Sequence, residues 1–132
     1  MKNWLIILIQ FFAFTNSSWA TIVQVGKGKT FTTIVAALQA VKQGDTIYVY
    51  EGHYKEKNLI IDKSIYLKGF NQPVLDGENK YEVISIKANK VTVDGFIVKH
   101  SGVSSIVDYA GIKIYDGRDV VIKNNIIDDA FF

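Results

Sequence analysis

The side chains in this sequence that are best suited to bind a transition metal are its two histidines, His53 and His100. Imidazole nitrogen is a good ligand for copper. Met1 is the only sulfur-containing residue, because the chain has one methionine and no cysteine. The histidines are 47 positions apart (100 − 53). Both are candidate metal ligands, but two exposed histidines in turns or at strand ends are the favoured interpretation.

Asp128 and Asp129 are the acidic pair that comes closest to what a glycoside hydrolase needs. Such an enzyme places two carboxyl groups on either side of one glycosidic bond. Adjacent residues of a strand point to opposite faces, so at most one of this pair can enter a cleft. Asp94 and Asp116 each precede a glycine and are interpreted as exposed turn residues. No catalytic residue is therefore assigned.

Tyrosines are numerous enough to suggest stacking against sugar rings. The candidates are Tyr48, Tyr50, Tyr54, Tyr66, Tyr81 and Tyr115. Three of them, Tyr48, Tyr50 and Tyr66, alternate with apolar residues and should face outward from a sheet. They could bind a glycan or simply cover the strand surface, and the covering role is preferred.

The elements that carry these residues repeat one short theme three times. Each copy has two apolar residues two positions apart, followed two positions later by a residue that tolerates positive φ. The copies are 65–69, 91–95 and 120–124. They end in Gly69, Gly95 and Asn124, which are residue types that enter the left-handed region at low cost. The pattern predicts the same backbone corner three times.

The interval between the copies indicates a solenoid. Leu67 and Val93 are 26 residues apart (93 − 67), and Val93 and Ile122 are 29 apart (122 − 93). Repeats of this length bury their inward residues by stacking on the next copy. Further short apolar segments flank the theme at 59–61, 83–86 and 112–114, and at 74–75, 96–98 and 126–127. Three short strands per repeat predict a parallel β-helix, with Leu67, Val93 and Ile122 in one inward column.

A single amphipathic helix is expected near the start, over about 31–43. Its apolar face would consist of Phe31, Ile34, Val35, Leu38 and Val41. Thr30 or Thr32 is available as N-cap, and Gly44 ends the helix. A helix in this position would cover the apolar end of the first coil. The coils are expected from about residue 45, and residues 101–110 are expected to form a loop that projects from the stack.

Residues 1–20 have the features of a cleavable signal peptide, which leaves 21–132 as the N-terminal part of a right-handed β-helix domain. A short basic start is followed by an apolar run that is too short to cross a bilayer comfortably. The remaining chain has 14 basic residues (15 − 1 for Lys2) and 13 acidic ones. This balance argues against nucleic acid or an anionic membrane as partner. No membrane insertion is expected after cleavage.

Three segments carry a resemblance to a known family: "GDTIYVYEGHYKEKNLIIDKSIYLKG", "VTVDGFIVKHSG" and "AGIKIYDGRDVVIKNNIIDDAFF". Together with the preceding helix, they resemble the N-terminal third of the NosD family of nitrous-oxide reductase maturation proteins. That family belongs to the right-handed β-helices with a pectin-lyase-like fold, which include carbohydrate-binding and sugar-hydrolase repeats. The resemblance implies an all-β, right-handed parallel β-helix with an N-terminal capping helix, truncated at its C-terminal end.

The resemblance also implies a function in the periplasm. NosD proteins assist in delivering copper to nitrous oxide reductase or in assembling its copper centres. Their partners are an ABC transporter and nitrous oxide reductase or a copper chaperone. No cofactor is expected in this part of the chain, whereas copper is possible for a full-length protein.

Two alternatives use the same scaffold. One is a secreted carbohydrate-active enzyme, a polysaccharide lyase or hydrolase. Against a lyase, the only arginine, Arg118, lies in a predicted turn beside Asp116 and Asp119. The other alternative is a carbohydrate-binding or adhesive β-helix without catalysis. Fold does not separate these functions, because function depends on the site.

Overall fold

The computed structural model describes residues 19–131, which form twelve short strands and one helix. These elements are β1 (Ile22–Val25), α1 (Ile34–Ala40), β2 (Thr46–Val49), β3 (His53–Tyr54), β4 (Leu59–Ile61), β5 (Tyr66–Gly69), β6 (Val74–Asp76), β7 (Ile84–Ile86), β8 (Thr92–Asp94), β9 (Ile97–Lys99), β10 (Ile112–Ile114), β11 (Val121–Lys123) and β12 (Ile126–Asp128). The predicted signal peptide falls almost entirely within residues 1–18, which lie outside the described part, as does Phe132.

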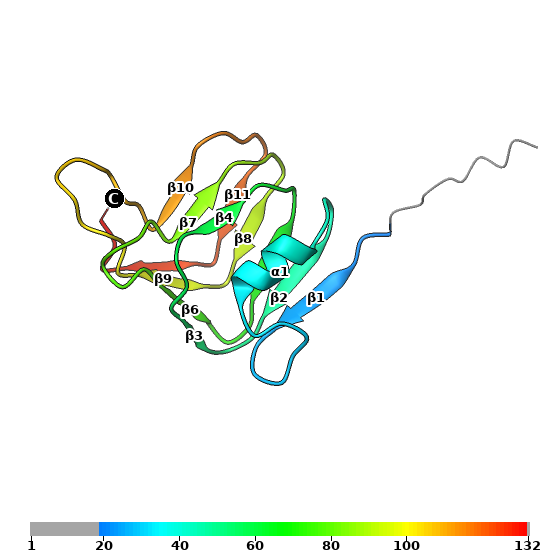
Figure 1. Cartoon of the computed structure of the whole chain (residues 1–132). Helices are drawn as coiled ribbons and strands as arrows, with labels where there is room; N and C mark the ends of the chain where they lie inside the picture. Colours follow the sequence, from blue (N-terminus) through cyan, green and yellow to red (C-terminus); the bar gives the residue numbers. More distant parts are fainter. Residues whose placement is uncertain (1–18, 132) are drawn as a thin grey trace, which may run out of the picture.

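The strands form three parallel sheets, which are the three faces of a solenoid. Their strand orders are β1-β2-β5-β8-β11, β10-β7-β4 and β12-β9-β6-β3. Neighbouring strands of each sheet come from successive coils, so the chain winds around in about four turns (Figure 1). The parallel β-helix predicted from the repeat is confirmed.

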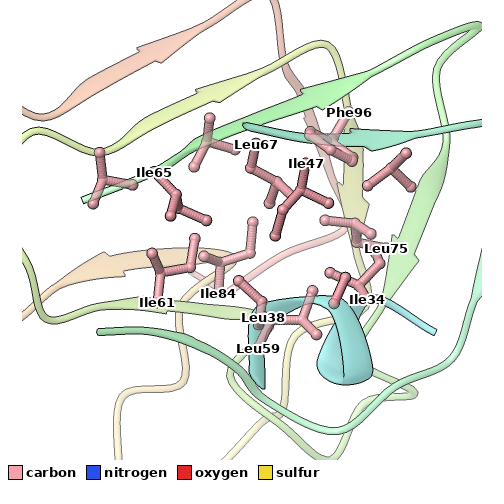
Figure 2. Packing of buried hydrophobic residues seen from close by; sticks show 14 of the residues in the cluster. Ile34, Leu38, Ile47, Leu59, Ile61, Ile65, Leu67, Leu75, Ile84 and Phe96 are labelled. Atoms are coloured by element: carbon pink, nitrogen blue, oxygen red, sulfur yellow. The ribbon is translucent and has the colours of Figure 1, made fainter. Parts of the chain in front are cut away.

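The strand register confirms the predicted column of Leu67, Val93 and Ile122, of which Ile122, in the last coil, is 39% exposed. Leu67 of β5 pairs with Val93 of β8, and Val93 pairs with Ile122 of β11. Leu67 and Val93 are fully buried, since each has side chains stacked on both sides. The central packing, in which residues of all three faces meet, includes Ile47, Leu75 and Ile84 (Figure 2).

The stack begins one strand earlier than the sequence indicated. The expectation was that the coils start at about residue 45, but β1 pairs in parallel with β2 over its whole length. The alternation in β1 is weak, because Ile22 remains 58% exposed and only Val25 is fully buried. The main-chain hydrogen bonds between β1 and β2, and not the pattern of buried side chains, hold this segment in the sheet.

The helix α1 is shorter than the predicted 31–43. Its N-cap is Thr33, whose hydroxyl accepts a hydrogen bond from Ala36 N–H, so the expected Thr30 or Thr32 cap was wrong. The carboxylate of Glu56 accepts from Ile34 N–H and Val35 N–H, at 2.7 and 2.8 Å. These two donors have no partner within a helix, so Glu56 fixes where α1 begins.

The function predicted for the helix is confirmed by its packing. Ile34 and Ala37 are fully buried, and α1 contacts β1, β2 and β4 at the beginning of the stack (Figure 1). At the other end of α1, Lys63 Nζ donates to the carbonyl oxygens of Leu38 and Val41. A cation at this position satisfies terminal carbonyl groups and the helix dipole.

Two of the three predicted corners are confirmed, and the third is wrong. Gly95 and Asn124 have positive φ, +89° and +55°. Gly69 instead lies in the extended strand β5, and the chain turns later, at Asn71 (φ 57°) and Gln72 (φ 53°). Position 69 needs a glycine for a different reason. The backbone of Gly95 in the next coil comes so close that there is no room for a side chain.

The predicted loop at 101–110 is confirmed. It contains no strand and projects from one side of the stack between β9 and β10 (Figure 1). Its tip is apolar, with Ile106 91% exposed. The hydroxyl of Ser104 accepts from the N–H groups of Ile106 and Val107 and so orders the tip.

Candidate functional site

The structure brings the two histidines together on one carboxylate. His53 lies in β3, Asp76 ends β6 and His100 follows β9, and these strands are neighbours in one sheet. His53 Nε2 is 2.7 Å from Asp76 Oδ2, and His100 Nδ1 is 2.9 Å from Asp76 Oδ1. Stacking of coils therefore makes neighbours of residues that are far apart in sequence. We call His53, Asp76 and His100 the histidine corner.

Asp76 is ionised in this corner. Its side chain is 6% exposed, and burial by itself would raise the pKa. Hydrogen bonds from Glu78 N–H and from both histidines outweigh burial and lower the pKa to about 2. Asp76 therefore stays negatively charged near neutral pH and is unsuited to act as a general acid.

The two histidines are more accessible than the carboxylate between them. Their side chains are 47% (His53) and 30% (His100) exposed. Asp129 Oδ2 lies 3.7 Å from His100 Nε2, and its side chain is 77% exposed; Asp128 is the exposed last residue of β12. Within residues 19–131, no three His, Asp or Glu side chains are grouped so that they could hold a metal ion. The corner therefore has two imidazoles without a complete ligand set.

A second buried carboxylate, Asp94, occupies the five-stranded face. It accepts hydrogen bonds from the Tyr66 hydroxyl (2.6 Å), Lys68 Nζ (2.9 Å) and Asn124 Nδ2 (2.9 Å). Lys123 Nζ is 4.0 Å away. Asp94 is 2% exposed, so its interpretation as an exposed turn residue was wrong.

The ionisation of this network is fixed by its hydrogen bonds. Burial would raise the pKa of Asp94, but bonds from Tyr66, Asn124 and Lys68 lower it well below the usual range. Donation to Asp94, together with burial and the nearby negative charge, raises the pKa of Tyr66 to about 12. Near neutral pH, Asp94 is therefore ionised and Tyr66 protonated, and the two are held together as a structural hydrogen-bonded pair.

The third face has its own buried acid, Glu82, which is 5% exposed. One of its carboxylate oxygens accepts a short hydrogen bond from the Ser85 hydroxyl, and the other lies 3.3 Å from the Tyr115 hydroxyl. Asn58 Nδ2 donates to Ser85 Oγ (2.7 Å) and to the Glu82 carbonyl oxygen (3.0 Å). Ser85 is 2% exposed and bonded on both sides, which does not suit a nucleophile that must reach a substrate.

The outward tyrosines are largely engaged with other side chains. Tyr50 is stacked on Phe70 with ring centroids 5.4 Å apart, and Lys29 Nζ lies 4.4 Å from the Tyr50 ring centroid. Tyr48 meets Phe70 edge to face at 4.9 Å. The outward orientation was predicted correctly. Because neighbouring groups occupy the ring of Tyr50, the contacts favour the covering role over a platform for sugars.

Asp76 and Glu82 were missed as important residues in the sequence. Asp76 precedes a glycine and resembles an ordinary turn residue, and Glu82 lies in a polar segment between two strands. The strand register of the structure pairs Asp76 with Lys99 of β9, and this brings the following residue, His100, close to Asp76. No comparable pattern marked Glu82, because its partners Ser85 and Tyr115 are connected only through side-chain geometry.

These observations define the chain as a parallel β-helix protein. It is 31% identical over 115 residues to a cell surface glycoprotein of Methanothermus fervidus. The alignment covers 85% of this chain but only 18% of that protein. No protein-family profile and no solved structure matches the chain.

Proposed function

We propose that this chain is a non-catalytic β-helical module of an exported protein that resides at the cell surface. The observation that carries this proposal is the use of the buried carboxylates. Asp94, Asp76 and Glu82, one on each face, are all bonded to side chains of neighbouring coils. The acidic groups that could have served catalysis hold the stack together, so the module acts as a rigid support.

The location is supported by the relative. Similarity to a cell surface glycoprotein favours an extracellular or surface position, in agreement with the predicted signal peptide at 1–20. The described residues 19–131 include no helix that is long and apolar enough to cross a membrane. They also lack the sequence Asn-x-Ser/Thr, so the attached glycans implied by the relative's name need not occur on this module.

The location can be tested with residues 1–132, tagged at the C-terminus and expressed in a bacterium that exports proteins through signal peptides. We expect that protease added to intact cells, or to cells with a permeabilised outer layer, removes the tag. A cytoplasmic protein of the same cells serves as control and should stay intact. Retention of the tag together with that control would contradict export.

The absence of catalysis needs a separate test. The purified chain is incubated with acidic and neutral polysaccharides, and reducing ends and unsaturated products are measured. We expect no release above that of an Asp94→Asn, Glu82→Gln double variant. Release by the wild-type chain that disappears in a double variant whose circular dichroism shows that it is still folded would assign an enzymatic function to these carboxylates.

A second candidate function is the copper-centre maturation implied by the NosD resemblance, in the periplasm and with an ABC transporter. The observation in its favour is the histidine corner, because His53 and His100 are adjacent in space and imidazole suits copper. This function predicts that the chain binds copper directly through His53 and His100, which a competition measurement with a copper chelator can test.

A further inference from the structure

Asp45 is a fourth buried carboxylate, and it differs from the other three in its partners. It directly precedes β2 and is 6% exposed. Its Oδ1 accepts a hydrogen bond from Thr21 N–H and its Oδ2 accepts one from Lys42 N–H, each at 2.8 Å. The other three buried carboxylates each lie within 4.0 Å of a lysine or histidine nitrogen. Among residues 19–131, no such side chain forms an ion pair with Asp45.

Asp45 is nevertheless ionised. The main-chain hydrogen bonds from Lys42 and Thr21 lower its pKa and outweigh burial, which by itself would raise it. The charge of the Lys42 side chain also lowers this pKa, although the side chain does not bond to the carboxylate. Buried charges in proteins are normally paired with an opposite charge. A cation placed at one of the two oxygens of Asp45 would therefore complete this site.

Thr21 is the first residue that the stack holds in place. Its N–H donates to Asp45, and its carbonyl oxygen accepts from Thr46 N–H at 2.9 Å. Before it, Trp19 is 83% exposed, Ala20 is also exposed, and neither takes part in a hydrogen bond among residues 19–131. The bond between Ala20 and Thr21 is also the predicted cleavage site of the signal peptide. Two independent observations thus point to the same peptide bond.

We propose that removal of the signal peptide turns the main-chain nitrogen of Thr21 into the cationic partner of Asp45. The proposal rests on the export proposed above. A signal peptidase hydrolyses the Ala20–Thr21 bond with one water molecule: the C–N bond breaks, Ala20 leaves as a carboxylate, and the nitrogen of Thr21 becomes an α-ammonium group. This nitrogen already lies 2.8 Å from Asp45 Oδ1, so the new charge forms at the carboxylate without a rearrangement of the main chain. The hydrogen bond becomes charge-assisted.

The charged residues around the Thr21 nitrogen are Asp45 and Lys42. Both line a pocket of about 240 Å³ together with Trp19, Thr21 and Ala40. The Lys42 side chain is exposed and can turn toward water, so it leaves the position at Asp45 Oδ1 to the α-ammonium group. Because the precursor lacks this ion pair, the processed chain should be more stable than a chain with an additional residue before Thr21.

The first experiment identifies the mature N-terminus. Residues 1–132, tagged at the C-terminus, are expressed in an exporting bacterium, and the product is analysed by intact-mass spectrometry and N-terminal sequencing. We expect a free N-terminus at Thr21. Export with cleavage at another bond would overturn this proposal and leave the proposed location standing. A chain that keeps residues 1–20 would contradict both.

The second experiment measures the pKa of the new α-amino group. In isotope-labelled processed protein, the Cα and Hα resonances of Thr21 are followed by NMR as the pH is raised. We expect a pKa of about 9 or higher, because the carboxylate favours the charged form, against about 8 for an ordinary α-amino group. In the Asp45→Asn variant, the pKa should return to about 8. An ordinary pKa in the wild-type chain would overturn the proposal.

A matched variant separates the charge from the rest of the site. One serine is inserted between Ala20 and Thr21, so that cleavage after Ala20 leaves one additional residue in the exposed place that Ala20 now occupies. The Thr21 N–H still bonds to Asp45, but the α-ammonium group is displaced. At pH 7 we expect the melting temperature of this variant to be about 4 °C below that of the processed wild type.

The dependence of this difference on pH follows from the raised pKa. The stabilisation is fully present below about pH 8 and is lost as the pH rises past about 9, so the two melting temperatures should agree near pH 10. Intact masses confirm the two N-termini. Equal melting temperatures at pH 7 would refute the ion pair, and a difference that stays the same up to pH 10 would assign the effect to the added residue instead of the charge.

Discussion

Gly69 and Gly95 approach each other across two adjacent coils so closely that a Cβ atom on Gly69 would lie 2.6 Å from the Gly95 carbonyl oxygen. The same atom would lie 2.9 Å from Cδ of Pro73. One obstacle is backbone and the other belongs to a rigid ring, so neither can move aside easily. The separation of the coils at this corner thus depends on the absence of a side chain.

Replacing Gly69 by Ala should destabilise the fold by about 3 kcal/mol, because the extra carbon forces two coils apart. Gly28→Ala is the matched control. Gly28 has φ +74° but no atom within 4 Å of an added Cβ, so only backbone strain of about 1 kcal/mol is expected there. Urea unfolding followed by circular dichroism measures both. If both variants lost the same free energy of unfolding, the close approach of Gly69 and Gly95 would not contribute to stability.

Asp94→Ala should destabilise the fold by about 3 kcal/mol, because three donors lose a buried, charged acceptor. This reverses the expectation from sequence that Asp94 is an exposed turn residue. Asp116→Ala, at an exposed turn position, should change the free energy of unfolding by less than about 0.5 kcal/mol. Similar values for the two variants in urea unfolding would contradict the network around Asp94.

The stabilisation by Asp76 should depend on pH. Its pKa is about 2 in the folded chain against an ordinary value of 3.8, so the folded state favours the ionised form. Its contribution is therefore fully present above about pH 4 and is lost as the pH falls toward 2. Asp76→Asn should be less stable than wild type by about 2 kcal/mol at pH 7, and the difference should close near pH 2. A difference that stays constant from pH 7 to pH 2 would argue against a lowered pKa.

The chain should not bind Cu(I) tightly. This ion prefers thiolate and thioether ligands, and the sequence after Met1 contains neither cysteine nor methionine. Competition with a Cu(I) chelator, using the chain without residues 1–20 and its His53→Ala, His100→Ala double variant, should show weak binding by both. Tight binding that disappears in the double variant would make the histidine corner a copper site and support the maturation function.

The repeat made the fold predictable, whereas the contacts at its corners were not. The interval from Leu67 to Val93 to Ile122 identified the inward column, because inward positions of a solenoid recur once per coil. Gly69 was misinterpreted because a glycine needed for φ and one needed for space look the same in a sequence. They differ only once the neighbouring coil is in place.

The candidate site was predictable only in part. His53 and His100 were identified as the residues of interest, but their adjacency depends on the exact register of β3, β6 and β9. An error of one residue in register would place His100 on the other face. The expectation that Asp94 is exposed was wrong for a related reason, because its hydrogen-bond donors come from the coils before and after it. Residues that are joined between coils have no local pattern.

The carboxylate networks have a consequence for how the chain unfolds. In a simple solenoid each repeat interacts with its direct neighbours, so the outermost repeat can fray by itself. Asp94 of β8, however, is bonded both to Tyr66 in the preceding coil and to Asn124 in the following one. Loss of the last coil removes the Asn124 hydrogen bond to Asp94 and uncovers β8, which raises the free energy of what is left. The coils should therefore melt together as one cooperative unit.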